Sequence, residues 1–286
     1  MAHIRTESNR RRPEVTSDGR QIRLGRILGK ERRAVVVACD HGMFDGPHRG
    51  MEDIPALLDR LGDAPDAILL APGMLARCGG YFGRRGAPAA IVRLNFNSVF
   101  CFHWKYSQSI ISNLWRAEEA AAAGADAVLV CLTLRTGSEA SDAKNAEVFS
   151  RLCQDAHRVG LPVLGEYFPS GHLSKTQDEF HEEVLIGCRM LFELGADFIK
   201  TFHTSRFREI TSSCAIPILG LGAEKKPTDL DALALAERLM ADGAGGVVFG
   251  RNVVQASNPK AFVCALQDIV KDGRTARYAA KKHHLS

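Results

Sequence analysis

The sequence predicts an α/β fold, a single TIM (βα)8 barrel. Eight short runs rich in Val, Ile and Leu alternate with helical stretches, and such runs are typical of parallel strands buried on both faces. No G-x-G-x-x-G motif follows the first run, which argues against a Rossmann sheet. The 286-residue length suits a barrel of roughly 250 residues. Eight uninterrupted strand–helix units favour a closed barrel over an open sheet.

The expected strands follow one another at intervals that leave room for a helix after each. They are Ala34–Cys39, Ala67–Ala71, Ala90–Phe96, Ala127–Cys131, Pro162–Phe168, Phe198–Phe202, Pro217–Leu221 and Gly246–Phe249. Two expected helices are Ser112–Ala123 and Asp229–Ala241. The left-handed residue that often follows a helix is supplied by glycine at four expected ends, namely Gly124, Gly160, Gly195 and Gly243.

The N-terminal segment differs in composition from the rest of the chain. It is polar and basic, with Arg5 and the run Arg10–Arg12. We interpret residues 1–20 as a flexible basic arm, which is either a solvated tail or a contributor to subunit contacts or a lid. Residues 21–286 are then expected to form one catalytic barrel domain.

Composition narrows the expected partners and compartment. The chain has 37 Lys and Arg against 33 Asp and Glu, a net charge of +4, which is too small by itself to predict nucleic-acid binding. None of the eight cysteines forms a C-x-x-C pair, so we expect a reducing, cytoplasmic location and no bound metal. No apolar run reaches the roughly 20 residues of a membrane helix, and no secretory signal is recognised. The expected partner is a small molecule.

Polar residues at the ends of the first and third strands are candidate substrate contacts, because barrel active sites lie at the carboxyl ends of the strands. Asp40 and His41 end the first strand and could orient a hydroxyl or move protons; alternatively, Asp40 caps a turn and His41 is polar surface. Arg93, Asn95 and Asn97 alternate along the third strand, which predicts one shared face. They could bind phosphate or carboxylate, or form an internal salt bridge or hydrogen-bond layer.

The fifth strand offers one acid/base candidate, whose identity depends on which face looks inward. Glu166 shares a face with Leu164 and Phe168, whereas Tyr167 lies on the other face. The residue on the inward face, Glu166 or Tyr167, is the acid/base candidate. In the alternative interpretation neither is catalytic, and the two residues belong to a salt bridge and to the helix layer.

The sixth strand contains a lysine within an apolar run. Lys200 follows Phe198 and Ile199, where its ammonium cannot easily reach water. Desolvation disfavours the charged form of an amine, which is what an amine needs in order to attack a carbonyl. The alternative is a buried ion pair with Asp or Glu. His203, after the same strand, is a further candidate substrate contact.

Glycine-rich loops follow the seventh and eighth strands, where TIM barrels commonly bind phosphate. Gly220 and Gly222 end the seventh strand, and Gly250 and Arg251 follow the eighth. Glycine lets backbone N–H groups approach an anion, and Arg251 adds a cation that can bind two oxygens. The alternative is that these are simple tight turns.

Together these motifs resemble the class I aldolases of the archaeal fructose-bisphosphate aldolase type, a group that includes a synthase of aromatic amino-acid precursors and the autoinducer-2 phosphate thiolase. The resemblance rests on Asp40–Gly42 with Gly46–Pro47, Phe198–Thr201, Leu219–Gly222 and Gly250–Gln255. It implies a Schiff-base enzyme without metal or other cofactor, often a homodecamer. Lys200 would form the imine, Asp40 and His41 would act on the substrate, and the glycines with Arg251 would hold phosphate.

One departure from this family bears on the mechanism. Phe168 precedes Pro169, where the aldolase branch usually has a tyrosine that transfers the proton. Phenylalanine cannot do so, and the hypothesis is that Glu166, Asp40 or His41 carries the acid/base step. We expect cleavage or formation of a carbon–carbon bond in a phosphorylated ketose such as fructose 1,6-bisphosphate. The alternatives are thiolase-type acyl transfer with coenzyme A, and binding of a phosphorylated metabolite without catalysis.

Overall fold

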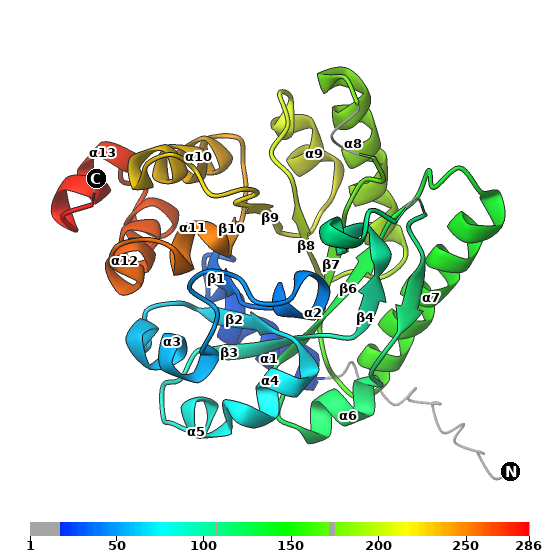
Figure 1. Cartoon of the computed structure of the whole chain (residues 1–286), viewed down its shortest axis with the longest axis horizontal. Helices are drawn as coiled ribbons and strands as arrows, with labels where there is room; N and C mark the ends of the chain where they lie inside the picture. Colours follow the sequence, from blue (N-terminus) through cyan, green and yellow to red (C-terminus); the bar gives the residue numbers. More distant parts are fainter. Residues whose placement is uncertain (1–17, 107, 172–174, 286) are drawn as a thin grey trace, which may run out of the picture.

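The computed structural model describes residues 18–106, 108–171 and 175–285. Eight parallel strands close into a barrel in the order β1-β10-β9-β8-β7-β6-β3-β2, which confirms the predicted fold (Figure 1). The barrel strands are β1 (Ala34–Ala38), β2 (Ala67–Leu70), β3 (Ala89–Arg93), β6 (Ala127–Leu132), β7 (Val163–Tyr167), β8 (Phe198–Thr201), β9 (Ile218–Leu221) and β10 (Gly246–Phe249). Seven of these agree with the expected strands to within one residue at each end; the third does not.

Helices surround the barrel (Figure 1). They are α1 (Asp18–Leu28), α2 (Gly42–Asp45), α3 (Ile54–Leu61), α4 (Pro72–Arg77), α5 (Gly79–Phe82), α6 (Ala117–Ala122), α7 (Glu139–Arg158), α8 (Gln177–Glu193), α9 (Phe207–Ser213), α10 (Asp229–Ala241), α11 (Arg251–Val254), α12 (Pro259–Val270) and α13 (Ala276–Lys282). The four glycines expected after helices all have positive φ, between 71° and 110°. Two 3-10 helices, η1 (Ser98–Phe100) and η2 (Phe102–Trp104), lie between β3 and α6.

Alternation along the strands separates two cores. Val36 and Leu69 belong to the interior cluster, whereas their neighbours Val35 and Ile68 pack in the outer layer with the helices. Helix α1 contributes Ile27 to the interior cluster. Residues 18–20, expected in a flexible arm, are the start of this helix, and residues 1–17 lie outside the described residues.

Aspartates just before the strands connect neighbouring strands. Asp126 accepts the backbone N–H of Ala90 at 2.9 Å, and Asp197 accepts that of Val163 at 2.8 Å. These two aspartates belong to the Gly-Ala-Asp sequences that precede β6 and β8. Each carboxylate therefore satisfies a backbone donor at the start of the adjacent strand.

The third expected strand ends early, because an asparagine takes the place of a backbone partner. The amide of Asn95 donates to the Cys131 carbonyl at 2.8 Å and accepts the Cys131 N–H at 2.9 Å. The chain thereby leaves the barrel, and β4 (Asn95–Asn97) pairs antiparallel with β5 (Ile111–Asn113). The expected helix Ser112–Ala123 is correspondingly wrong in its first half, and only α6 forms.

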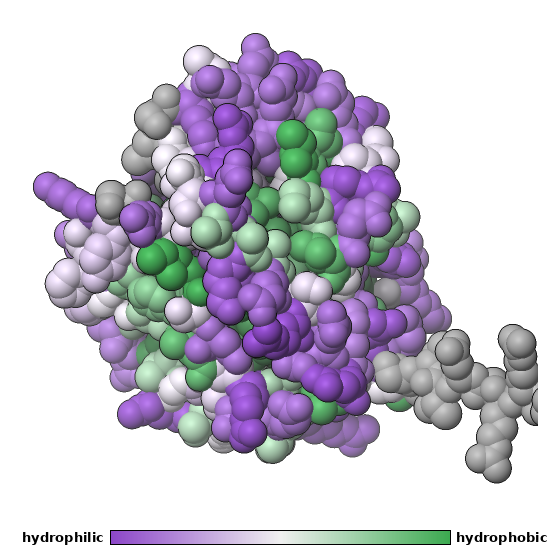
Figure 2. All heavy atoms as spheres, turned by 90° about the vertical axis from the view of Figure 1, so that its right-hand side faces the viewer, coloured by the Kyte–Doolittle hydropathy of each residue, from purple (hydrophilic) through white to green (hydrophobic). Residues whose placement is uncertain are grey.

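This excursion between β3 and α6 exposes hydrophobic side chains. Phe102, Trp104, Tyr106, Ile110 and Leu114 are all exposed. Figure 2 shows the side of the molecule that lies on the right in Figure 1, where hydrophobic patches are separated by hydrophilic side chains. None of the described helices combines the length and the apolar character that crossing a membrane requires.

Candidate active site

A cavity of about 640 Å³ is lined largely by residues at the carboxyl ends of the barrel strands. Asp40, His41, Arg93, Glu166 and Lys200, all predicted from the sequence as candidate site residues, line this one cavity. Their strands β1, β3, β7 and β8 are spread around the barrel, so only barrel closure brings these side chains together. The position agrees with the usual location of TIM-barrel active sites.

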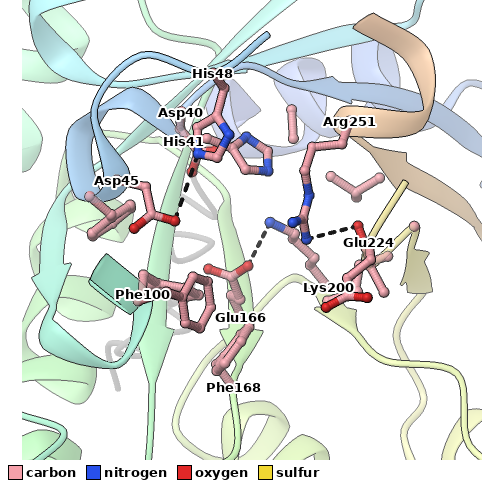
Figure 3. A pocket seen from close by; sticks show the side chains of 18 of the residues that line it. Asp40, His41, Asp45, His48, Phe100, Glu166, Phe168, Lys200, Glu224 and Arg251 are labelled. Carbon is pink, nitrogen blue, oxygen red and sulfur yellow. Dashed lines mark hydrogen bonds and ion pairs between the residues drawn. The ribbon is translucent and has the colours of Figure 1, made fainter. Parts of the chain in front are cut away.

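Lys200 points into the cavity and pairs with Glu166 (Figure 3). Its Nζ lies 2.5 Å from Glu166 Oε1, and the two side chains are 9% and 2% exposed. Residues 166 and 200 are register partners of β7 and β8, which fixes their separation through the sheet. The amine is therefore buried and paired with a carboxylate, but it remains open to the space where a substrate would lie.

Arg93 connects this pair to a second carboxylate. Its NH2 donates to Glu166 Oε2 at 2.6 Å and its Nε donates to Asp40 Oδ2 at 2.7 Å. The guanidinium also lies 5.0 Å from the ring centroids of both Phe44 and Phe100, where cation–π attraction favours it. Arg93 therefore forms the internal salt bridge of the alternative interpretation, and both of its carboxylate partners line the cavity. Arg93 lines the cavity as well, and its NH1 has no hydrogen-bond partner among the described residues, so its contact with substrate stays a prediction.

Burial and these cations set the ionisation of the site. Burial alone would raise the pKa of Asp40 and of Glu166, but the charges of Arg93 and Lys200 outweigh it, so both pKa values are lowered. Burial lowers the pKa of His41 to about 4, with Lys200 and Arg251 adding to the effect and Asp40 opposing it. At neutral pH the site therefore presents two carboxylates and a neutral imidazole.

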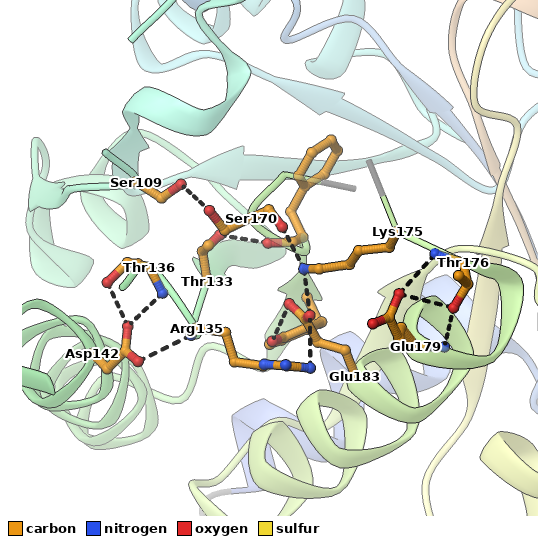
Figure 4. Close-up of polar contacts among 12 residues, drawn as sticks. Ser109, Thr133, Arg135, Thr136, Asp142, Ser170, Lys175, Thr176, Glu179 and Glu183 are labelled. Atoms are coloured by element: carbon orange, nitrogen blue, oxygen red, sulfur yellow. Dashed lines mark hydrogen bonds and ion pairs between the residues drawn. The ribbon is translucent and has the colours of Figure 1, made fainter. Parts of the chain in front are cut away.

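Tyr167 does not belong to the cavity, which corrects its prediction as a catalytic candidate. It points to the outer face of β7, where its hydroxyl lies 3.3 Å from Glu183 Oε1 on α8. Glu183 also pairs with Lys175 and approaches Arg135 at 3.6 Å (Figure 4). Burial and the Glu183 carboxylate raise the pKa of Tyr167, so its proton is held more tightly than usual.

Three predicted substrate contacts also lie outside the cavity. Asn95 bonds to the backbone of Cys131, and Asn97 donates to Thr133 Oγ1 at 2.7 Å. The hydrogen-bond-layer interpretation is therefore correct for both, because the chain has already left the barrel at β4. His203 turns away to Asp242, with Nε2 at 3.3 Å from Oδ2.

Three of the four predicted phosphate-binding residues line the cavity, namely Gly222, Gly250 and Arg251. Gly220 does not, because this position faces the helix layer. A Cβ there would lie 2.2 Å from Leu239 of α10. At Gly250 a Cβ would lie 2.5 Å from the His41 ring, so this glycine lets the imidazole pack closely.

Arg251 is anchored but retains donor capacity. It donates from NH2 to the Ala223 carbonyl at 3.1 Å, while its buried Nε has no hydrogen-bond partner among the described residues. Asn252 ties the loops after β9 and β10 together, since it donates to the Gly222 carbonyl at 2.9 Å and accepts the Lys226 N–H at 2.7 Å. The fully buried Asn252 was not singled out from the sequence, although it directly follows Arg251.

Other cavity residues were also missed by sequence reasoning. Asp45 and His48 line the cavity, with His48 Nε2 at 3.7 Å from Asp45 Oδ2. Their position directly after the first strand end was a usable signal. Phe100 and Phe102 line it as well, but they come from the excursion after β3, which the sequence pattern did not predict. No described group of three His, Cys, Asp or Glu side chains is arranged to hold a metal ion.

Comparison with known proteins places this geometry in a family. Residues 34–256 match the DeoC/LacD family aldolase. The chain is 31% identical over 268 residues to the 3-hydroxy-5-phosphonooxypentane-2,4-dione thiolase of Klebsiella pneumoniae, covering 91% of this chain and 84% of the thiolase. It is 28% identical over 258 residues to the 2-amino-3,7-dideoxy-D-threo-hept-6-ulosonate synthase 1 of Archaeoglobus fulgidus, covering 88% and 91%.

A solved structure gives the same result. It is an archaeal fructose-1,6-bisphosphate aldolase with its catalytic Lys covalently bound to the carbinolamine intermediate of the substrate. Its TM-score is 0.75 at 26% identity, and the match covers 88% of this chain and 99% of that one. The chain therefore belongs to the DeoC/LacD aldolase family and is an enzyme of the aldolase type.

Proposed function

We propose that this enzyme is a class I aldolase in which Lys200 forms an imine with the ketone of a phosphorylated, sugar-like substrate. The observation that carries the proposal is the position of the Lys200 amine, which lines the cavity and lies 2.5 Å from a carboxylate that can accept its proton. The archaeal relative with a substrate bound covalently to its catalytic lysine supports the same chemistry.

Glu166 is the proposed acid and base of imine formation. As a carboxylate it accepts a proton from the Lys200 ammonium, and the neutral amine then attacks the substrate carbonyl. The resulting carbinolamine loses its hydroxyl as water when Glu166 returns the proton to that oxygen. The products of these steps are a protonated imine on Lys200, one water and the regenerated carboxylate.

The charge array around the amine favours this intermediate. Lys200 and Arg93 carry two positive charges, and Glu166 and Asp40 carry two negative charges. Replacing the ammonium of Lys200 by a protonated imine leaves this balance unchanged. The iminium charge thus develops next to Glu166, and Arg93 holds both Glu166 and Asp40 in place. Fixed charges of this kind stabilise a charged intermediate without reorganisation.

Carbon–carbon cleavage then uses the iminium as an electron sink. A carboxylate removes the proton of the substrate hydroxyl, the adjacent C–C bond breaks, and its electron pair forms the enamine while an aldehyde leaves. Protonation of the enamine carbon and addition of water release the ketone and restore Lys200. Glu166 takes the proton-transfer role here because Phe168, which also lines the cavity, cannot.

Arg251 and the glycine loops are the proposed phosphate site. Arg251 has a buried Nε without a hydrogen-bond partner among the described residues, and Gly222, Gly250 and Lys226, from the loops after β9 and β10, line the same cavity. Guanidinium groups suit the paired oxygens of phosphate. An anion held there would orient the carbonyl toward Lys200, which turns binding energy into positioning.

Acyl transfer is a second candidate, favoured by the 31% identity to a phosphorylated-diketone thiolase. The two reactions share the imine but differ in the group that attacks or leaves. Coenzyme A would be required for acyl transfer and irrelevant to aldol cleavage.

The test is product formation by the purified enzyme from fructose 1,6-bisphosphate, fructose 1-phosphate and the phosphorylated diketone, each with and without coenzyme A. Aldehyde release that is independent of coenzyme A and absent in Lys200→Met is the expected result. Product formation only with coenzyme A would assign acyl transfer instead. Undiminished product formation by Lys200→Met would refute the imine mechanism.

A further inference from the structure

Five phenylalanine rings form a continuous wall of the cavity. Phe44, Phe100, Phe102, Phe168 and Phe202 all line it. Successive ring centroids lie 4.8 Å apart for Phe44 and Phe100, 4.5 Å for Phe100 and Phe168, and 5.0 Å for Phe168 and Phe202. These contacts join side chains from α2, from the excursion after β3 and from the ends of β7 and β8. We call these five rings the phenylalanine wall.

The wall and the proposed phosphate site lie on different sides of the reactive amine. Figure 3 shows Phe100 and Phe168 on one side of the Lys200 amine and Arg251 on the other. Arg251 and Lys226 follow β10 and β9, next to each other in the barrel. A substrate whose carbonyl reaches Lys200 therefore has one end toward Arg251 and the other end toward the rings.

Positive charge is unevenly distributed between these two sides. Among the described residues that line the cavity, Arg93, Lys200, Lys226 and Arg251 are the Lys and Arg side chains. Arg93 and Lys200 are each within 2.7 Å of a carboxylate oxygen, so Asp40 and Glu166 balance their two charges, although Arg93 NH1 has no hydrogen-bond partner among the described residues. Arg251 and Lys226 are the cations that remain to meet an anion. The wall side holds charged groups as well. The Arg93 guanidinium lies 5.0 Å from the ring centroids of Phe44 and Phe100, but it is paired with Asp40 and Glu166. Asp45, which directly follows Phe44, and His103 also line the cavity.

This asymmetry is costly for a substrate with an anion at both ends. A phosphate moved against these rings loses its hydration and meets an arginine whose charge is already paired with two carboxylates, and the faces of the rings are themselves negative. An apolar group in the same place gains roughly 25 cal/mol for each Å² that is removed from water. The wall therefore favours an uncharged, apolar substituent.

We propose that the enzyme handles a substrate with a single anionic end, and that the aldehyde it releases or adds is uncharged and apolar. The proposal rests on the imine chemistry proposed for Lys200. In the condensation direction, the enamine carbon of a singly phosphorylated ketone attacks the aldehyde carbonyl, whose oxygen takes a proton from the acid group. Water then hydrolyses the iminium. The phenylalanine wall is the part of the site that selects the aldehyde.

The experiment measures condensation of dihydroxyacetone phosphate with two competing aldehydes, phenylacetaldehyde and glyceraldehyde 3-phosphate. The expected result is a kcat/KM for phenylacetaldehyde at least about tenfold higher, because only its side chain matches the wall. Equal or higher kcat/KM for glyceraldehyde 3-phosphate would overturn the proposal.

A substitution that adds a positive charge to the phenylalanine wall tests its role in selecting the aldehyde. Phe102 is 48% exposed, so Phe102→Arg adds a cation at the cavity without opening the core. It should move the preference toward glyceraldehyde 3-phosphate by about tenfold or more, as a charge-assisted hydrogen bond to phosphate would. Trp104→Arg is the control, since Trp104 belongs to the same 3-10 helix, is 66% exposed and does not line the cavity. An equal shift in both variants would contradict a specific role of the wall.

A separate trapping experiment distinguishes failure of this proposal from failure of the imine mechanism. Borohydride reduction in the presence of dihydroxyacetone phosphate should attach the ketone to Lys200. An adduct at Lys200 together with a preference for the phosphorylated aldehyde would overturn the wall proposal alone. Absence of any adduct would overturn both, because the selection of an aldehyde requires the enamine.

Discussion

Two lysine–glutamate pairs, each with a buried glutamate, lie on opposite faces of β7. Inside the barrel, Lys200 and Glu166 are 9% and 2% exposed. Outside it, between β7 and α8, Lys175 and Glu183 are 16% and 1% exposed. An arginine approaches each glutamate, since Arg93 donates to Glu166 and Arg135 lies near Glu183.

The two pairs differ in what surrounds them. Lys200 and Glu166 line a cavity large enough for a phosphorylated sugar, whereas Lys175 and Glu183 do not line it. Lys175 instead donates to the Ser170 carbonyl, and Tyr167 approaches Glu183, so this outer pair connects Ser170 and Tyr167 to α8. Burial and ion pairing alone therefore do not distinguish a reactive lysine from a structural one, and access to a substrate does.

The largest expected effect separates the two lysines. Lys200→Met should lower turnover by at least about 10⁴-fold, because the amine that forms the imine is removed. Lys175→Met should leave turnover per folded molecule within about threefold, yet lower the free energy of unfolding, since a buried Glu183 loses a partner. Steady-state kinetics and urea denaturation of both variants measure this contrast. Comparable losses of turnover would remove the distinction between the pairs.

The next effect separates the two glutamates. Glu166→Gln should lower kcat by roughly 10²- to 10³-fold, the usual contribution of a positioned acid/base group. The glutamine can still hydrogen-bond, so folding should be retained. Glu183→Gln is the matched control and should change kcat little. If Glu166→Gln turns over normally while the imine still forms, the proton must travel through Asp40 or His41 instead.

A smaller effect is expected at the anion end of the cavity. Arg251→Met should raise the KM for a phosphorylated ketose by roughly 10- to 100-fold and change kcat much less, because a charge-assisted contact is lost in both ground and transition states. Arg135→Met removes an arginine beside the outer pair and should leave KM unchanged. An unchanged KM in Arg251→Met would place the phosphate elsewhere.

The smallest effect concerns the pH dependence of stability. His41 has a folded-state pKa of about 4 against an ordinary value of 6.5, so between these values the unfolded chain binds more protons and stability falls as the pH falls. His41→Gln should reduce that loss by about 1–3 kcal/mol, since one pKa unit corresponds to about 1.4 kcal/mol. Urea denaturation of both proteins at pH 7 and pH 4.5 measures it. An identical loss in the variant would contradict a His41 that stays neutral in the folded protein.

The barrel could be predicted from the sequence because its strands are apolar on both faces and lie between helices. The same pattern could not show where β3 ends. Asn95 and Asn97 continue the alternation set by Arg93, but the side chain of Asn95 bonds to the backbone of Cys131 and the chain leaves the barrel. The end of β3 therefore depends on Cys131, which is 36 positions away in the sequence. A local alternation pattern carries no information about such a distant partner.

The polar residues of the candidate site could be predicted from the sequence, but the phenylalanine wall could not. Strand ends identified Lys200 and Asp40, and alternation correctly placed Glu166 and Tyr167 on opposite faces without deciding which face looks inward. Phe100 and Phe102 could not be found this way, because they reach the cavity from 3-10 helices in the excursion after β3. Their position follows from tertiary packing rather than from a local pattern.

Covalent trapping tests the central claim most directly. The enzyme is mixed with dihydroxyacetone phosphate or fructose 1-phosphate, reduced with borohydride, digested, and mapped by mass spectrometry. A single reduced adduct on Lys200, lost in Lys200→Met and retained in Lys175→Met, is the predicted result. An adduct on Lys175, or none on Lys200 with either ketone, would contradict the assignment of the inner lysine as the nucleophile.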